Sequence, residues 1–165
     1  MKHNYYERAS KFIDVMLPYL AECEKVSDFQ LAVKKFCYFH PRRKVLCDNG
    51  SGRIAIITSD YVIKMDRFDG SADWGNCRSE FNLYQKVKDS DFDYLFAETK
   101  PVERGQFTFY VMPRIKGVDS RQYWADAYMT DDEYKFVRSL GVRDMHPGNF
   151  GIRHGKVCLI DYAAY

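Results

Sequence analysis

The stretch that decides the expected fold is VRDMHPGNFGIRHGKVCLIDYAAY, residues 142–165. In it an acid, Asp144, and an amide, Asn149, stand on either side of a Pro-Gly turn, and a second acid, Asp161, follows an apolar strand. Because a Pro-Gly turn reverses the chain, we expect the Asp144 carboxylate and the Asn149 amide to fold back towards one another. Oxygen ligands from Asn149 and Asp161 suit Mg²⁺, which prefers carboxylate and carbonyl oxygens together with substrate phosphates. The stretch is therefore either a nucleotide-phosphate site or an ordinary loop and strand.

A histidine in the same loop offers two rival interpretations. His146 and Asp144 could form a metal-binding pair, or they could belong to a triad of the Ser-His-Asp kind. The sequence has no second histidine at ligand spacing and no G-x-S-x-G elbow, so it favours neither.

Composition and charge narrow the class of protein. The chain has 165 residues, enough for one compact domain of one or two lobes, and its 46% apolar and 16% aromatic residues suit a packed interior or an aromatic-lined cleft. A net charge of +2 is too small to argue for nucleic-acid binding, and no long apolar run predicts a membrane span. The cysteines are odd in number and include no C-x-x-C pair, which indicates neither a disulfide framework nor a zinc site. We expect a soluble, cytoplasmic protein with reduced thiols.

Outside the C-terminal stretch, helical and strand-like patterns alternate. Apolar residues recur at helical spacing near the N-terminus, and from Lys44 the pattern becomes that of a three-stranded antiparallel meander. The sequence predicts helices over residues 5–24, from 27 to near Pro41, over 76–87 and from Thr130, and strands over 44–47, 53–58, 61–65, 94–103, 107–112 and 156–160.

Three further features would complete a phosphate site. The glycine-bearing turn at residues 49–52 could let the backbone approach phosphates, although hairpins also use Asn-Gly for conformational reasons alone. Lys64 lies between Ile63 and Met65 in an apolar strand, where its charge needs either a partner or solvent. Glu80, on the next predicted helix, could be that partner. An exposed lysine and an exposed glutamate remain the alternative.

In this order the residues resemble the protein-kinase-like superfamily, and most of all the short kinase-like proteins of tailed bacteriophages. The kinase pattern H-R-D-x-x-x-x-N matches residues 142–149, D-F-G matches 161–163 and V-A-I-K matches 61–64. Val142 stands where that pattern has His, and Ala163 stands where D-F-G has Gly. The His-Pro-Gly-Asn motif also resembles the corresponding motif of aminoglycoside phosphotransferases and UbiB-type atypical kinases.

The resemblance implies an α+β, protein-kinase-like fold that binds ATP and Mg²⁺ between two lobes. Residues 1–43 would form a helical extension, 44–116 a lobe with a five-stranded antiparallel sheet and one helix, and 117–165 a strongly reduced second lobe. A hinge would lie near residues 112–117. By the resemblance, the phosphates would be bound by Gly50, Ser51, Gly52 and Lys64, and the adenine site would be lined by Met112 and Ile115. Glu80 would fix Lys64. Mg²⁺ would be held by Asn149 and Asp161, and Asp144 would orient the acceptor hydroxyl.

Two functions of different classes remain open. The first is an ATP-dependent phosphotransferase, a minimal Ser/Thr protein kinase that acts on a host protein or on itself. The second is a kinase-like module that binds and modulates a host protein without phosphoryl transfer. The complete set of polar residues favours the enzyme, whereas the short second lobe, with only four residues after Asp161, favours the binding module. Apolar surface left uncovered by that lobe could be buried in a homodimer.

Overall fold

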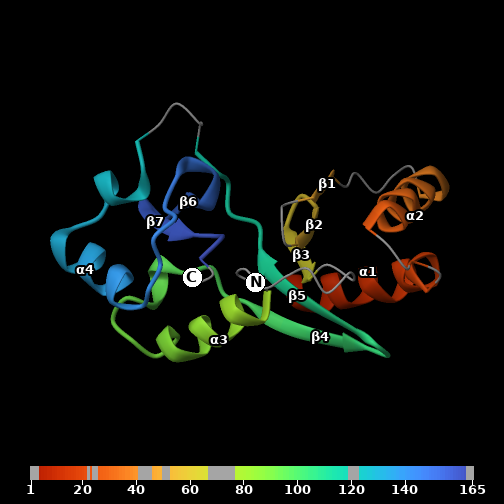
Figure 1. Cartoon of the computed structure of the whole chain (residues 1–165), viewed down its shortest axis with the longest axis horizontal. Coiled ribbons are helices and arrows are strands. Elements are labelled where there is room, and N and C mark those ends of the chain that lie inside the picture. The colour runs from red at the N-terminus through yellow and green to blue at the C-terminus, as the bar shows by residue number, and fades with distance from the viewer. Residues whose placement is uncertain are drawn as a thin grey trace. The chain divides into compact units, whose positions relative to one another are not determined.

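The computed structural model describes residues 4–21, 23, 26–40, 46–49, 53–66, 77–118 and 123–162 (Figure 1). The chain has mixed α+β structure, as the sequence predicts. It divides into two compact units, the first formed by Met1–Trp74 with Lys100–Arg114 and the second by Gly75–Thr99 with Ile115–Tyr165. Within the described ranges, no helix combines the length and the apolar character needed to cross a membrane.

An antiparallel sheet forms the centre of the first unit. Its strands are β1 (Leu46–Asn49), β2 (Arg53–Ile57), β3 (Tyr61–Asp66), β4 (Lys100–Arg104) and β5 (Phe107–Pro113), in the order β1-β2-β3-β5-β4. The meander predicted from the alternating sequence is confirmed, since β1 pairs with β2 and β2 with β3. Pro101 lacks an N–H group and lies in β4, at an edge of the sheet where an unpaired position is tolerated.

The first unit also contains two helices, of which the first packs on the sheet. They are α1 (Tyr5–Leu20), which packs against β3 and β5, and α2 (Val26–Phe39), which packs against α1. The buried face of α1 repeats at helical spacing, as predicted, and Phe12 meets Phe36 of α2 edge to face with ring centroids 5.1 Å apart. Arg104 of β4 donates to Asp14 at 2.6 Å, which ties the edge strand to α1.

The second unit contains a two-stranded sheet and two longer helices. Its elements are α3 (Cys77–Val87), η1 (Asp93–Leu95), η2 (Ala125–Tyr128), α4 (Asp131–Ser139), η3 (Pro147–Asn149), β6 (Phe150–Arg153) and β7 (Lys156–Leu159). The predicted helix start at Thr130 is confirmed, because its side chain accepts from the Glu133 N–H while the Glu133 carboxylate accepts from the Thr130 N–H. The Ala97 N–H donates to the Leu159 carbonyl at 2.9 Å and joins the segment after η1 to β7.

Two predicted boundaries are wrong. Residues 94–99 are not part of a strand, because the turn-forming residues 89–93 lead into η1, and Phe96 then pairs with Leu159 in the second unit. Helix α1 ends at Leu20 rather than at residue 24, two residues after Pro18, whose ring nitrogen has no hydrogen to donate to a carbonyl in the preceding turn. The helix with Glu80 belongs to the second unit, although the prediction places it within residues 44–116. The division of the chain into residues 1–43, 44–116 and 117–165 stays a prediction.

Candidate functional site

The loop that carries Asp144 and Asn149 is held in shape by its own histidine. The Nδ1 atom of His146 accepts a hydrogen bond from the Gly148 N–H at 2.9 Å, and the His146 carbonyl accepts one from the Asn149 N–H at 2.9 Å. A Cβ atom at Gly148 would lie 2.7 Å from Cε1 of this imidazole, so any side chain there would push the imidazole from its place. The predicted Pro-Gly turn is therefore a short 3₁₀ helix, η3, with His146 as its N-cap.

His146 faces Asp144 with its other ring nitrogen. Because Nδ1 accepts from Gly148, the neutral imidazole carries its proton on Nε2. This Nε2 atom lies 3.8 Å from Oδ2 of Asp144, too far for a hydrogen bond but close enough for electrostatic attraction. Both side chains are 46% exposed, so the Asp144 carboxylate is held beside a proton donor while it stays accessible to solvent.

Asn149 joins the two acidic segments. Its Nδ2 atom donates to the backbone carbonyl of Asp144 at 3.1 Å. The backbone carbonyl of Asn149 accepts from the N–H groups of Ile160 and Asp161, at 2.8 and 3.2 Å. Hydrogen bonds thus connect the segments of Asp144, Asn149 and Asp161 within one unit. The Asn149 amide returns to the backbone of Asp144, as the turn predicts, while its approach to the Asp144 carboxylate stays a prediction.

Glu80 reaches the same segment from α3. Its side chain is fully buried, and Oε1 accepts from the Tyr162 N–H at 3.2 Å, one residue after Asp161. The Tyr162 ring is also fully buried and meets Phe96 edge to face at 5.3 Å. Its hydroxyl donates to the Ala97 carbonyl at 2.7 Å and lies 2.9 Å from Oγ1 of Thr99. Burial, together with the nearby Glu80 charge, raises the pKa of Tyr162 well above its usual value, so the phenol stays neutral.

The donor set at this segment fits a magnesium ion. The bond from Nδ2 of Asn149 to Asp144 uses the amide nitrogen and leaves the amide oxygen, Oδ1, as the atom that could coordinate a cation. Asp161 would add a carboxylate, and two protein oxygens with water and phosphate oxygens are typical of Mg²⁺. Among the described residues, no group of three or more His, Cys, Asp or Glu side chains gathers as a metal site of the all-protein kind.

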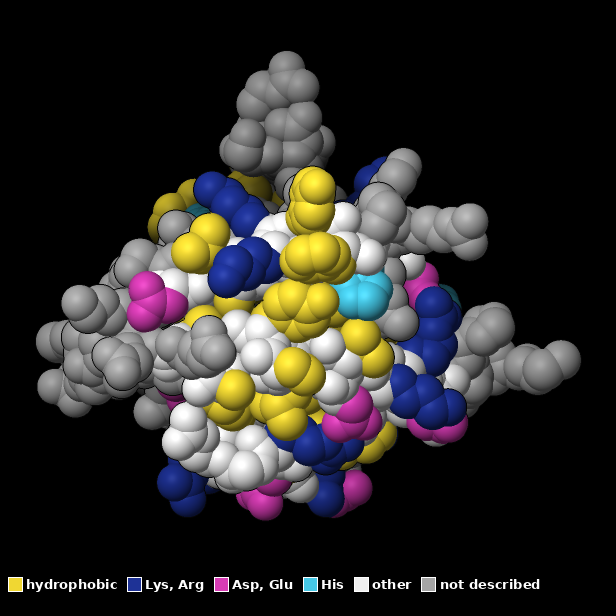
Figure 2. Space-filling model, turned by 90° about the vertical axis from the view of Figure 1, so that its right-hand side faces the viewer, with side chains coloured by type: hydrophobic (Ala, Val, Ile, Leu, Met, Phe, Trp, Pro, Cys, Tyr) yellow, Lys and Arg dark blue, Asp and Glu magenta, His cyan; other side chains and the backbone are white. Residues whose placement is uncertain are grey.

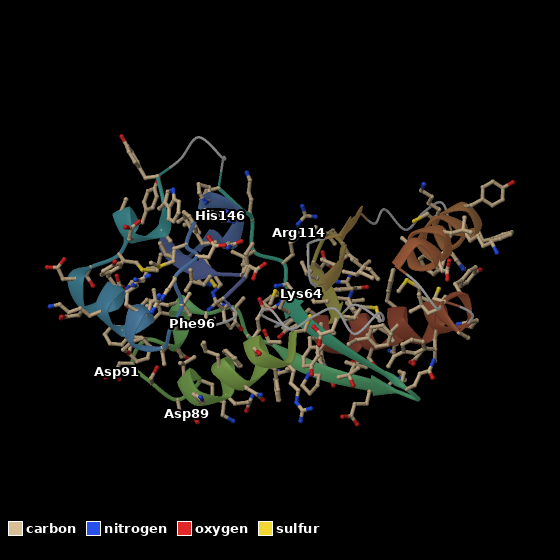
Figure 3. All side chains as sticks on the ribbon, in the orientation of Figure 1. Lys64, Asp89, Asp91, Phe96, Arg114 and His146 are labelled. Carbon is tan, nitrogen blue, oxygen red and sulfur yellow. The ribbon has the colours of Figure 1, made fainter. Side chains whose placement is uncertain are left out.

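Lys64 lies in a strand of apolar residues, as the sequence predicts. It lies on β3 (Figure 3), opposite Tyr110 of β5 and Ala55 of β2. The residue is only 6% exposed. The exposed-lysine alternative is therefore wrong, and so is the exposed-glutamate alternative, since Glu80 is fully buried. Lys64 belongs to the first unit and Glu80 to the second, and their ion pair stays a prediction.

The residues expected near the adenine and the phosphates fall in different parts of the chain. Met112 is buried in β5 of the first unit, opposite Val62 of β3. Ile115 begins the final segment of the second unit, next to Gly151 of β6. The turn with Gly50, Ser51 and Gly52 lies outside the described residues.

Two contributors to this region were not singled out from the sequence. Thr99 and Tyr162 fix the backbone directly after Asp161, and Tyr162 occupies the middle position of the D-F-G-like triplet. Tyr162 could have been singled out from the sequence because it directly follows Asp161, an expected metal ligand, and the neighbours of a ligand help to set its orientation. Thr99 carried no such signal, since it is 63 residues away along the chain.

Comparison with known proteins leaves the family open. No protein-family model matches the chain, and searches of curated proteins and of solved structures find no match. The kinase-like interpretation therefore rests on the motif residues and on the hydrogen bonds among them.

Proposed function

We propose that the chain is a phosphotransferase that uses ATP and Mg²⁺ to phosphorylate a hydroxyl group of a protein, in the manner of a minimal Ser/Thr kinase. One observation carries the proposal. Asn149 donates to the backbone carbonyl of Asp144 and its own backbone carbonyl accepts from the N–H of Asp161, so the solvent-accessible Asp144 and the two residues proposed as oxygen ligands belong to segments that are bonded to one another within one unit. Phosphoryl transfer needs this combination of an oriented acceptor and neutralised phosphate charge.

Each of the four site residues in the second unit would have a distinct part in this reaction. Oδ1 of Asn149 and the carboxylate of Asp161 would hold Mg²⁺, which supplies neutralisation of the phosphate charge when bound. The Asp144 carboxylate orients the acceptor hydroxyl and takes its proton as the hydroxyl oxygen bonds to phosphorus and ADP departs. The Glu80 carboxylate, through the Tyr162 N–H, holds the segment of Asp161 in place.

The first unit would contribute the remaining nucleotide contacts. Lys64 would bind the α- and β-phosphates, and Met112 and Ile115 would contact the adenine. Burial of the Lys64 side chain supports a functional charge, since a lysine is seldom buried without a specific partner. Gly50 to Gly52 would cover the phosphates.

A binding module remains the second candidate function, favoured by the surface of the two N-terminal helices. Figure 2 shows hydrophobic side chains in a band across the face of the molecule at these helices. Among the described side chains of α2, Leu31, Tyr38 and Phe39 are exposed, at 56%, 79% and 63%. Exposed apolar side chains that gather in this way are typical of protein interaction surfaces. In this alternative the chain modulates a host protein without transferring phosphate, and a homodimer stays a prediction as well.

Incubation of the purified chain with γ-labelled ATP and Mg²⁺, alone and with bacterial lysate, tests the enzyme directly. Asp161→Ala should abolish labelling because the metal loses its charged ligand. Asp144→Ala should keep ATP binding and slow transfer by roughly 10²–10⁴-fold, the usual effect of losing a general base.

Asp91→Ala is the matched control, since Asp91 is an exposed acid of the same unit that lies at the opposite edge from His146 (Figure 3). It should label like the parent chain. Absence of any labelled product with the parent chain would contradict the enzyme. Full labelling by Asp144→Ala would instead remove Asp144 from the mechanism.

A further inference from the structure

Two large aromatic side chains are exposed immediately before η2. Tyr123 is 76% exposed and Trp124 is 54% exposed, although tryptophan in particular is usually well buried. Large aromatic rings at a surface are enriched where a protein binds a partner, because they supply contact area at little entropic cost. These two therefore need a functional explanation.

A hydrogen bond joins the segment after them to the loop with Asp144. The Ala125 N–H donates to the Met145 carbonyl at 2.9 Å, and both residues are buried. Trp124 directly precedes Ala125, and Asp144 directly precedes Met145. Tyr128, at the other end of η2, packs against Phe150 of β6 with tilted rings whose centroids are 5.9 Å apart. The backbones that follow Trp124 and Asp144 are thus joined by a hydrogen bond within one unit.

The segment that begins with the exposed pair is acidic. Residues 123–134 include four acids and no lysine or arginine, whereas the chain as a whole has a net charge of +2. Glu133 is buried and bonded within the unit, but Asp126, Asp131 and Asp132 are exposed. The neighbouring loop adds Asp144 and Arg143, whose charges offset each other. An acidic surface next to open aromatic rings complements a cationic partner.

An internal contact illustrates the expected chemistry. On α4 the guanidinium of Arg138 lies over the ring of Tyr134 at 6.0 Å from the centroid. Guanidinium and ammonium groups bind aromatic faces in this way, and tryptophan is the best of the three aromatic rings for it. Tyr123 and Trp124 can offer the same contact to a cation supplied by another molecule. The Asp126 carboxylate, two residues after Trp124, is exposed and accepts from the Ala127 N–H at 3.1 Å.

From these observations we infer that Tyr123, Trp124 and Asp126 form a docking surface for a basic polypeptide segment, whose arginine or lysine side chains flank the hydroxyl that is phosphorylated. The inference rests on the proposed function for the fate of the docked segment. The docking itself requires only the aromatic rings and the carboxylate.

Three synthetic peptides with one central serine test the specificity of transfer. One carries arginine on both sides of the serine, one alanine and one aspartate. With the full chain, ATP and Mg²⁺, the arginine peptide should have the highest kcat/KM. Trp124→Ala and Asp126→Asn should each raise KM for that peptide about two- to five-fold, the size of an exposed cation–π contact or ion pair, and the change should fall on KM rather than on kcat. Asp89→Asn, an exposed acid elsewhere in the same unit, should leave KM unchanged.

Direct binding separates failure of the docking surface from failure of the proposed function. Fluorescence anisotropy of dye-labelled peptides, without ATP, should show that the arginine peptide binds more tightly than the alanine peptide and that Trp124→Ala weakens this binding while Tyr38→Ala does not. Such binding without any phosphoryl transfer would keep the docking surface and reject the kinase. Equal binding of the arginine and alanine peptides, or binding unaffected by Trp124→Ala and Asp126→Asn, would overturn the inference even if the chain proved to be an active kinase.

Discussion

Single residues decide how closely the segments of the second unit can approach. Gly151 of β6 faces the backbone of residues 115–117, and Gly117 forms an isolated bridge with it. A Cβ atom at Gly151 would lie 2.3 Å from the Lys116 carbonyl oxygen and 2.7 Å from Cγ2 of Ile115. Neither the backbone nor the branched carbon of Ile115 can yield easily, so the absence of a side chain at Gly151 is a packing requirement.

Replacement of Gly151 by alanine should therefore destabilise the protein by about 1–3 kcal/mol, the usual cost of overpacking. Gly117→Ala is the matched control, because a Cβ atom there would meet only the Phe150 carbonyl oxygen, at 4.0 Å. This control should be neutral or slightly stabilising, since alanine restricts the unfolded chain. Urea unfolding measures both variants, and equal stability of the two would contradict the packing requirement.

The Tyr162 hydroxyl makes a second prediction at the residue scale. Tyr162→Phe leaves the Ala97 carbonyl and the Thr99 hydroxyl without this buried partner, and it should cost about 1–3 kcal/mol of unfolding free energy. Because Tyr162 and Thr99 share these bonds, the double variant Tyr162→Phe with Thr99→Val should lose less than the sum of the two single losses. Additive losses in urea unfolding would show that the two hydroxyls act independently.

At the scale of elements, the start of α4 is joined to η1 and β7 by a charged cluster. The Tyr94 hydroxyl donates to Oε1 of Glu133 at 2.5 Å, and Lys156 lies 3.8 Å from the same oxygen and over the Tyr94 ring at 4.2 Å. The bond from Tyr94 lowers the pKa of Glu133, against the opposing effect of burial. Burial and the Glu133 carboxylate raise the pKa of Tyr94 to about 12.

These shifts predict how stability depends on pH. The lowered pKa of Glu133 contributes stability above its ordinary value of 4.5, and this is lost as the pH falls through the folded value. The raised pKa of Tyr94 contributes stability below its ordinary value of 10.0, and this is lost as the pH rises towards 12. Tyr94→Phe should therefore move the acid-unfolding midpoint to higher pH, as followed by circular dichroism. Tyr134→Phe, on the exposed side of α4, should leave that midpoint in place.

At the scale of the whole molecule, the proposed nucleotide site predicts a change in thermal stability. ATP with Mg²⁺ at about 100 times its dissociation constant should stabilise the folded chain by roughly 2.7 kcal/mol, or about 5–10 °C in Tm for a chain of this size. Differential scanning fluorimetry measures the shift. Lys64→Met and Asp161→Ala should reduce it strongly, whereas Asp91→Ala should keep it. An unchanged Tm with millimolar ATP and Mg²⁺ would mean that the nucleotide site is absent.

The sequence by itself determined the elements and the local shape of the loop with Asp144 and Asn149. Alternation of apolar residues predicted the meander, helical spacing predicted the buried face of α1, and Thr130 with Glu133 predicted the start of α4. These features depend on neighbours within a few residues, so their physical causes are present in any short window of sequence. The return of Asn149 to Asp144 is of the same kind, since only five residues separate them.

Only the tertiary structure decided which distant segments support the candidate site. Glu80 accepts from the Tyr162 N–H across 82 residues, and the Tyr162 hydroxyl reaches Ala97 across 65. Residues 94–99 have the composition of a strand, but burial of Phe96 beside Leu159 draws them into the second unit instead. Local propensity is worth only fractions of a kcal/mol per residue, whereas burial of a large side chain is worth about 1.5–3 kcal/mol. Long-range burial therefore overrides the local preference, and a single sequence does not reveal where such burial will occur.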